Sequence, residues 1–295
     1  MTDTSTDLRD RTQRFLFENA DIRGEAVQLD SAYREIIDIH QYAPGVSRLL
    51  GEFMAAAVLL ATTLKFEGKL VLQARSEGQV PLLMAECDNA LRIRAIARGA
   101  EQATSERFDQ LLPGGTLAIT VDPTRGQRYQ GIVPLTEDSL AHCLDAYFRQ
   151  SEQLGTRFWL AANGERAAGM LLQQLPANKV EDPALRREQW EHAGTLATTL
   201  RETELLELAA PEIMHRLYHE EPLRLFTPKP VRFKCNCSRE RTLNALASLP
   251  AAEVHELLEE LGSITMDCEF CNQQYCFTES DLQAVLQPDE PGRLH

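Results

Sequence analysis

The sequence predicts an α+β N-terminal domain with mixed sheets and helices, a partly helical linker and a small C-terminal domain that carries paired cysteines. Three observations lead to this fold class. Helical and strand patterns alternate irregularly over the first 175 residues, prolines and charged residues are frequent between 176 and 230, and five of the seven cysteines fall between 235 and 276. We therefore expect a core domain over 1–178, the linker over 179–230 and a cysteine domain over 231–295.

Two helices and six strands are predicted near the start of the chain. Residues 31–40 open with Ser31, a typical N-cap residue, and residues 45–64 are small and apolar enough to be buried on most sides. Short alternating segments bounded by Gly, Pro, Asp or Asn are typical of strands. They should form one or two sheets, and they cover residues 69–74, 82–86, 91–98, 116–121, 129–133 and 157–160.

Two cysteines lie far from the other five. Cys143 belongs to a segment, 136–152, whose apolar residues recur at helical spacing, and Cys87 lies inside an apolar strand. Free cysteines are among the most frequently buried residues. We therefore predict that both are core residues.

The linker contains two short amphipathic segments, 200–208 and 211–218, between prolines that recur from 176 to 230. Their apolar stripes are narrow, so that neither helix would be stable without a neighbour to dock on. The stripes consist of Leu205 and Leu208, and of Ile213, Met214 and Leu217. Two interpretations stay open: a segment that is ordered only conditionally, or a pair of helices packed permanently on the first domain.

Composition excludes several classes of function. The 295 residues include 43% hydrophobic and 25% charged ones, and 30 Lys and Arg against 44 Asp and Glu give a net charge of −14. Such a chain repels nucleic acid and anionic lipid. The longest apolar run, 53–64, is shorter than the roughly 20 residues that span a bilayer. The N-terminus lacks a secretory signal pattern, so we expect a cytosolic protein.

The remaining cysteines form two close pairs. Cys235 and Cys237 make a CxC motif, and Cys268 and Cys271 make a CxxC motif 30 residues further on. In a reducing compartment such pairs are more typical of metal ligands than of structural disulfides. Four thiolates are a common ligand set for one tetrahedral Zn²⁺. The sequence therefore predicts a zinc site, with one Zn²⁺ per chain.

Two helices are predicted between the pairs. Ser238 can cap the first, Pro250 lies near the start of the second, and Gly262 can end it. A segment of this length has little core of its own, so the metal should supply much of its stability. The four thiolates leave a net charge of −2 on the site, which the nearby Lys234, Arg239 and Arg241 could compensate, although a solvated basic face is an equal alternative.

Other residues near the pairs have more ordinary interpretations. His255 lies mid-helix and is expected at the surface. Cys276 could compete for the metal or for a disulfide, but the Tyr275–Phe277 stretch resembles a strand that returns to the core, and we predict that Cys276 is buried. A thioredoxin-type catalytic pair needs a helix N-terminus after a buried strand. Acidic neighbours and a turn signal at Asn272 disfavour it.

Enzyme and nucleic-acid functions find little support. Residues 231–295 hold 5 Lys and Arg against 11 Asp and Glu, which disfavours a zinc-ribbon nucleic-acid module. Nucleotide-binding, serine-hydrolase and zinc-protease motifs are missing from the sequence. The Tyr218–Glu221 stretch, with one histidine beside two carboxylates, is interpreted as a solvated helix end.

Several motifs carry a resemblance to a known family. The chain resembles, over almost its whole length, the 33-kilodalton heat-shock protein family, the redox-regulated chaperones of the bacterial cytosol. The resemblance rests on RFLFEN at 14–19, LKFEG at 64–68, RYQG at 128–131, SEQL at 151–154, RLYHEE at 216–221 and FKCNCSRER at 233–241.

This resemblance implies an ATP-independent holdase, not an enzyme, that binds unfolding client proteins and neither nucleic acid nor membrane. It implies that Cys235, Cys237, Cys268 and Cys271 bind zinc in the reduced, inactive state. Oxidation would then form disulfides Cys235–Cys237 and Cys268–Cys271, unfold the linker and produce a homodimer. Cys276 departs from the family pattern, so a different disulfide partner stays open.

Physical chemistry favours the same direction of regulation. A disulfide between Cys235 and Cys237 encloses one residue, so it restrains the unfolded chain little. Zinc binding contributes about 10–16 kcal/mol in zinc-finger peptides, as much as the roughly 5–15 kcal/mol stability of a whole domain. Oxidation with zinc loss should therefore destabilise the cysteine domain.

Overall fold

The computed structural model describes residues 9–63, 67–151 and 155–286, with side chains as far as residue 282. The chain forms two compact units, Met1–Lys234 and Cys235–His295, and each is described by itself. The predicted α+β class is confirmed, with two sheets, a helical region and a C-terminal cluster of four cysteines. Residue 64 of the second predicted helix and residue 152 of the third lie outside the described residues.

The first sheet of the N-terminal unit is antiparallel and has the order β10-β1-β2-β9-β8, with β11 also paired to β1. Its strands are β1 (Arg11–Phe17), β2 (Ile22–Leu29), β8 (Thr156–Ala162), β9 (Ala167–Gln174), β10 (Leu223–Leu225) and β11 (Lys229–Pro230). Only β8 was predicted. Linker strands β10 and β11 therefore complete one edge of this sheet.

The second sheet has the order β12-β5-β4-β3-β6-β7 and is antiparallel except where β12 joins β5. Its strands are β3 (Gly68–Arg75), β4 (Leu82–Asp88), β5 (Arg92–Arg98), β6 (Thr116–Pro123), β7 (Tyr129–Pro134) and β12 (Arg232–Phe233). Five of these match the predicted strands to within two residues at each end. The sixth, β12, lies directly before the first paired cysteine.

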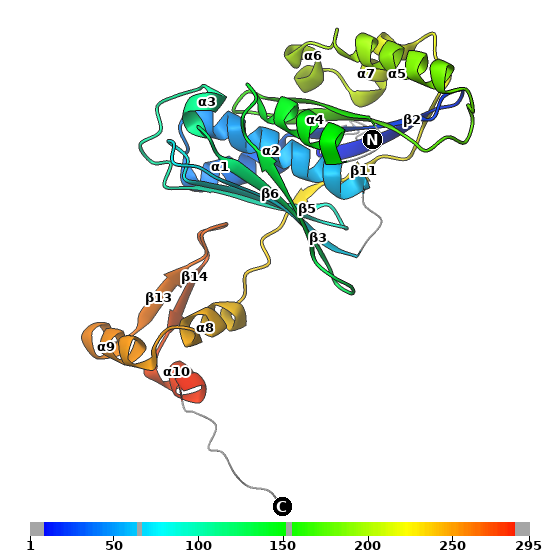
Figure 1. Ribbon diagram of the computed structural model, residues 1–295. Helices are drawn as coiled ribbons and strands as arrows, with labels where there is room; N and C mark the ends of the chain where they lie inside the picture. The colour runs from blue at the N-terminus through cyan, green and yellow to red at the C-terminus, as the bar shows by residue number, and fades with distance from the viewer. Residues whose placement is uncertain (1–8, 64–66, 152–154, 287–295) are drawn as a thin grey trace, which may run out of the picture. The chain divides into compact units, whose positions relative to one another are not determined.

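Helix α2 (Pro44–Thr63) is the core of the N-terminal unit. It lies between the two sheets (Figure 1) and contacts β2, β8 and β9 on one side and β3, β4 and β5 on the other. Phe53, Met54 and Leu59 are fully buried, as predicted for this apolar segment. Among the described residues it alone is long and apolar enough to cross a membrane, and most of it is buried inside the fold.

Three further helices complete this core. They are α1 (Ser31–His40), α3 (Phe108–Leu111) and α4 (Leu140–Ser151). Cys143 on α4 and Cys87 on β4 are buried, which confirms the prediction for both. Burial raises the pKa of each thiol above its usual value, so neither is a reactive thiolate.

The linker forms three helices that cover the other face of the first sheet (Figure 1): α5 (Pro183–Ala197), α6 (Glu202–Glu207) and α7 (Ala210–Tyr218). Asp182 caps α5 by accepting from the Ala184 N–H. The predicted stripe residues Leu205, Ile213, Met214 and Leu217 are buried, and Leu208 packs at the margin. The sheet contributes Phe15, Phe17, Ala20, Ile22, Ala161, Ala168, Met170 and Leu172 to this interface.

The C-terminal unit is small. It contains α8 (Arg239–Ala247), α9 (Ala251–Leu261), α10 (Glu279–Leu286) and the hairpin of β13 (Ile264–Asp267) and β14 (Gln274–Phe277). Gly262 ends α9 in the left-handed conformation, as predicted. Among the described residues, its buried core consists of Leu246, Val254, Leu258, Ile264, Phe277 and Leu282.

Candidate metal centre

The four paired cysteines meet in the C-terminal unit. Cys235 and Cys237 precede α8, whose first turn is capped by Ser238 Oγ accepting from the Arg241 N–H at 3.2 Å. Cys268 follows β13, and Cys271 lies in the turn before β14. The Sγ atoms of Cys235 and Cys268 are 3.6 Å apart, and those of Cys237 and Cys271 are 3.5 Å apart. All four Sγ atoms lie within 4.8 Å of one another.

This donor set fits a zinc ion. A Zn–S bond of about 2.3 Å in a tetrahedron places neighbouring sulfurs about 3.8 Å apart, close to the two distances above. Burial raises the pKa of Cys268 and Cys271 above the usual range of a thiol. Burial opposes ionisation of Cys235 too, but the Cys237 N–H and neighbouring thiols lower its pKa overall. Four half-buried thiols whose sulfur atoms converge in this way form a site able to bind a metal.

The CxxC pair lies in a tight turn between two strands rather than at the start of a helix. The N–H groups of Cys271 and Asn272 both donate to the Cys268 carbonyl, at 3.2 and 2.7 Å. Asn272 has φ of 55°, which confirms the predicted turn. A strand follows, not a helix, so the pair lacks the helix N-terminus that activates a thioredoxin-type thiol.

Tyr275 is a contact of the site that the sequence analysis missed. Its hydroxyl donates to Cys237 Sγ at 3.2 Å, and this hydrogen bond raises the pKa of Tyr275 to about 12. Tyr275 lies two residues before the buried Phe277 and therefore shares its face of β14. The alternation of side chains along this strand was the sequence signal that could have placed Tyr275 beside the cysteines.

Cys276 is exposed, and the prediction that it is buried was wrong. Successive side chains of a strand point to opposite faces, so Cys276 faces away from the small core that Phe277 fills. His255 is exposed on α9, as predicted. The structure thus groups four cysteines and leaves the fifth at the surface.

The nearby basic residues have separate roles. Arg241 donates to the Asn236 carbonyl at 2.7 Å and so holds the loop between Cys235 and Cys237. Arg239 donates to the Cys276 carbonyl at 2.7 Å, pairs with Asp281 at 2.9 Å and lies over the Phe277 ring. Arg239 therefore holds α8 to β14 and α10, while Lys234 is exposed at the end of the N-terminal unit.

Two buried polar side chains hold the linker, one in the turn between β1 and β2 and one on β2, and neither was predicted. Asp21 accepts from the N–H groups of Asn178, Lys179 and Val180 and from the Arg186 guanidinium. Although burial favours the protonated acid, these donors lower the pKa of Asp21 overall.

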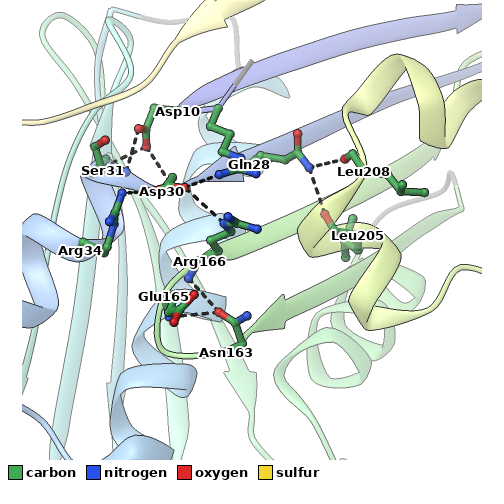
Figure 2. A network of polar contacts seen from close by, with 12 residues as sticks. Asp10, Gln28, Asp30, Ser31, Arg34, Asn163, Glu165, Arg166, Leu205 and Leu208 are labelled. Carbon is green, nitrogen blue, oxygen red and sulfur yellow. Dashed lines mark hydrogen bonds and ion pairs between the residues drawn. The ribbon is translucent and has the colours of Figure 1, made fainter. Parts of the chain in front are cut away.

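Gln28 on β2 holds the middle of the linker. Its side-chain amide donates to the carbonyls of Leu205 and Leu208, at 3.2 and 2.6 Å (Figure 2). Beside it, Asp30 pairs with Arg34 and Arg166 in the same network. The last carbonyls of α6 thus depend on one core side chain for part of their hydrogen bonding.

Fold and site together define a two-unit protein in which a cysteine cluster able to bind a metal follows a segment of docked helices. A family model described as Hsp33 protein matches residues 10–278. The chain is 55% identical over 280 residues to a 33 kDa chaperonin of Pseudomonas aeruginosa and 54% identical to one of Azotobacter vinelandii, each alignment covering 94% of both chains. The crystal structure of the 33 kDa chaperonin of Thermotoga maritima superposes with a TM-score of 0.79 at 20% identity, covering 94% of this chain and 98% of that one.

This chain therefore belongs to the Hsp33 family. It is a redox-regulated chaperone of the holdase type with a cysteine cluster, and it is not an enzyme.

Proposed function

We propose that Cys235, Cys237, Cys268 and Cys271 hold one Zn²⁺ in the reduced protein and that this keeps the chaperone inactive. The observation that carries the proposal is the meeting of four Sγ atoms within 4.8 Å from two segments 30 residues apart. When bound, the metal supplies the cross-link between these segments that the small core supplies only in part.

Oxidation reverses this state by forming disulfides Cys235–Cys237 and Cys268–Cys271. Two thiolates lose two electrons for each disulfide formed, and one molecule of hydrogen peroxide accepts these electrons together with two protons from solvent and yields two waters. The disulfide sulfurs no longer serve as thiolate ligands, so the four cysteines release the metal. Each disulfide closes a short loop that leaves α8 and β13 unlinked, so the C-terminal unit loses stability.

The linker, residues 179–230, then leaves the first sheet. Helices α6 and α7 are short, so they depend on docking rather than on helix propensity for their stability. Release uncovers Phe15, Phe17 and Met170 on the sheet and Ile213 and Leu217 on the linker. Such a surface would bind unfolding client proteins without ATP and would also favour a homodimer. We expect this activity in the bacterial cytoplasm, since the relatives are bacterial proteins.

Metal analysis with disulfide mapping tests the proposal. Freshly reduced protein should contain one zinc per chain, and a Cys268→Ser, Cys271→Ser double variant should contain none. A Cys87→Ser variant is the matched control, because that cysteine is buried in the other unit. After peroxide treatment, mass mapping should find each cysteine joined to its neighbour in sequence. Zinc-free reduced protein, or disulfides that join the two motifs, would contradict it.

A further inference from the structure

One edge of the first sheet is occupied by the linker itself. Residues 222–231 run antiparallel along β1, with Leu225 opposite Phe15 and Lys229 opposite Thr12. Beyond the strands, the Glu18 N–H donates to the Pro222 carbonyl at 2.8 Å, and the Val231 N–H donates to the Asp10 carbonyl at 2.7 Å. The linker thus covers the whole length of β1.

This covering segment is a poor strand. It contains Pro222, Pro228 and Pro230, and proline has no N–H to donate to a ladder. Pairing is interrupted between β10 and β11, which have three and two residues. Leu225 and Phe226 remain 42% and 39% exposed, so their side chains add little burial. The segment occupies the edge without making a continuous ladder.

Strand β1, which pairs with this segment, is well suited to pairing with another strand. β1 is seven residues long and is paired to β2 on its other side from Arg11 to Leu16. Backbone groups of successive strand residues point to opposite edges. Because Asp10, Arg14 and Glu18 bond to the linker, the even-numbered residues of β1 face that edge. Thr12 and Leu16 would lose the linker as partner for their N–H and C=O groups if it left, whereas the Arg14 carbonyl would keep the Gln13 side-chain amide, which donates to it at 3.0 Å.

The edge also adjoins the apolar face that the linker helices cover. Phe15 and Phe17 point to that face, and the Phe17 ring meets the Tyr218 ring of α7 at 5.0 Å between centroids. A strand added beside β1 would place alternate side chains next to these two rings. At the opposite edge of the sheet, the Phe158 N–H of β8 donates to the Asp145 carboxylate at 2.8 Å. That N–H is therefore not available to an added strand.

We propose that the outer edge of β1 binds an extended segment of an unfolded client as an added antiparallel strand, in the place that residues 222–231 occupy at rest. This inference rests on the proposed release of the linker and names the surface and the partner that follow from it. The partner is a proline-free segment with alternating apolar side chains, which can make the continuous ladder that the linker does not. The backbone contributes affinity without regard to client sequence, as a holdase requires.

A peptide of defined backbone tests this. The probe is a fluorescent seven-residue peptide of alternating valine and threonine, matched to the length of β1, and the control carries N-methyl groups on its consecutive central residues. Both keep the same side chains, but only the probe can pair. Fluorescence anisotropy should show that oxidised full-length protein binds the probe at least about tenfold more tightly than the N-methylated control. This is the ratio expected when the control loses several backbone hydrogen bonds.

Two variants separate backbone from side chain. Leu16→Pro removes an N–H that faces the edge, and Leu16→Ala keeps it while shortening the same side chain. Probe binding should fall about tenfold in the first and stay within about threefold in the second. If Leu16→Pro fails to fold, residue-resolved hydrogen exchange of the oxidised wild type tests whether the probe pairs with the edge of β1. Amides of Thr12, Leu16 and Glu18 should lose protection on oxidation and regain it with the probe.

The outcomes distinguish the two proposals. Amides of residues 223–231 that stay protected after oxidation would contradict linker release itself, and with it this inference. Release of those amides together with equal binding of the probe and its methylated control would overturn the edge proposal alone.

Discussion

The carboxylate of Asp21 lies 2.6 Å from the guanidinium of Arg186, and both side chains are largely buried, at 4% and 12% exposed. The same carboxylate accepts the N–H groups of Asn178, Lys179 and Val180. One residue in the turn after β1 therefore holds both the first residues of the linker and its first helix. The stability of the inactive state should depend on this pair.

Replacing Asp21→Asn should loosen the linker in reduced protein. The asparagine leaves Arg186 buried without its partner, and breaking a buried ion pair in this way typically destabilises by about 3–5 kcal/mol. Hydrogen exchange should become faster in α5–α7, and less peroxide should be needed for chaperone activity. Zinc content should not change. Glu18→Gln is the control, since its pair with Arg224 is exposed. Equal exchange rates in both variants would contradict a special role for Asp21.

Truncation of Ile213→Ala tests how far the linker depends on apolar docking. Ile213 is fully buried against the first sheet, and such truncations destabilise by about 2–4 kcal/mol. Leu185→Ala is the matched control, because that residue is 42% exposed on α5 and its loss should change stability by less than about 0.5 kcal/mol. Urea unfolding of the reduced protein measures both. If Leu185→Ala lowered the free energy of unfolding as much as Ile213→Ala, burial of Ile213 against the sheet would not explain the loss of stability.

Glu52 should make the stability of the reduced protein depend on pH. It lines a cavity of about 690 Å³ between α2, α4, β8 and the linker. Burial, and then the Glu202 carboxylate of α6, raise the pKa of Glu52 to about 8, against the opposing effect of Arg48. The folded protein therefore holds this proton more tightly than the unfolded chain, whose carboxyl titrates near 4.5. The contribution of Glu52 to stability is therefore fully present below that value and is lost as pH rises toward 8.

The measurement compares unfolding free energies at about pH 6.5 and about pH 8.5. Wild type should be less stable at the higher pH, and Glu52→Gln should lose most of this difference. Glu207→Gln, at an exposed position on α6, is the control and should retain it. An unchanged pH dependence in Glu52→Gln would assign the effect to other groups.

Cys276→Ser should leave the switch intact. The side chain is exposed and faces away from the core, so the hydroxyl is solvated. Zinc content, disulfide map and peroxide response should equal those of wild type. Phe277→Ala on the same strand is the contrast, since loss of a fully buried ring typically destabilises by about 3–5 kcal/mol. Loss of metal from Cys276→Ser would make Cys276 part of the site.

Local sequence patterns predicted many of the elements but missed β1, β2 and β9 of the first sheet. The apolar run of α2, the capping by Ser238 and the left-handed Gly262 were all visible from neighbours in the chain. Strands β10, β11 and β12 were not, because two or three residues become a strand only by pairing with distant partners. Helix α6 was predicted within residues 200–208, since its apolar stripe recurs at helical spacing.

The candidate site divides in the same way. The spacing of the four cysteines predicted a cluster because close pairs can meet at one ion. The roles of Asp21 and Gln28 were not predictable, since Arg186 and Leu205 lie more than 160 residues away in sequence. The error at Cys276 came from recognising a strand without assigning its faces. Its neighbour Phe277 fills the core, and alternation then places Cys276 outside.

The central claim is that loss of the cysteine-bound metal releases the linker and that release creates the activity. One time course of peroxide treatment tests it most directly, with zinc followed by a chelating dye, α5–α7 amides by hydrogen exchange, and client aggregation by light scattering. Zinc should appear first, loss of amide protection second, and suppression of aggregation only then. Reduction should restore the inactive state only when zinc is supplied. Full chaperone activity while the α5–α7 amides remain protected would contradict the account.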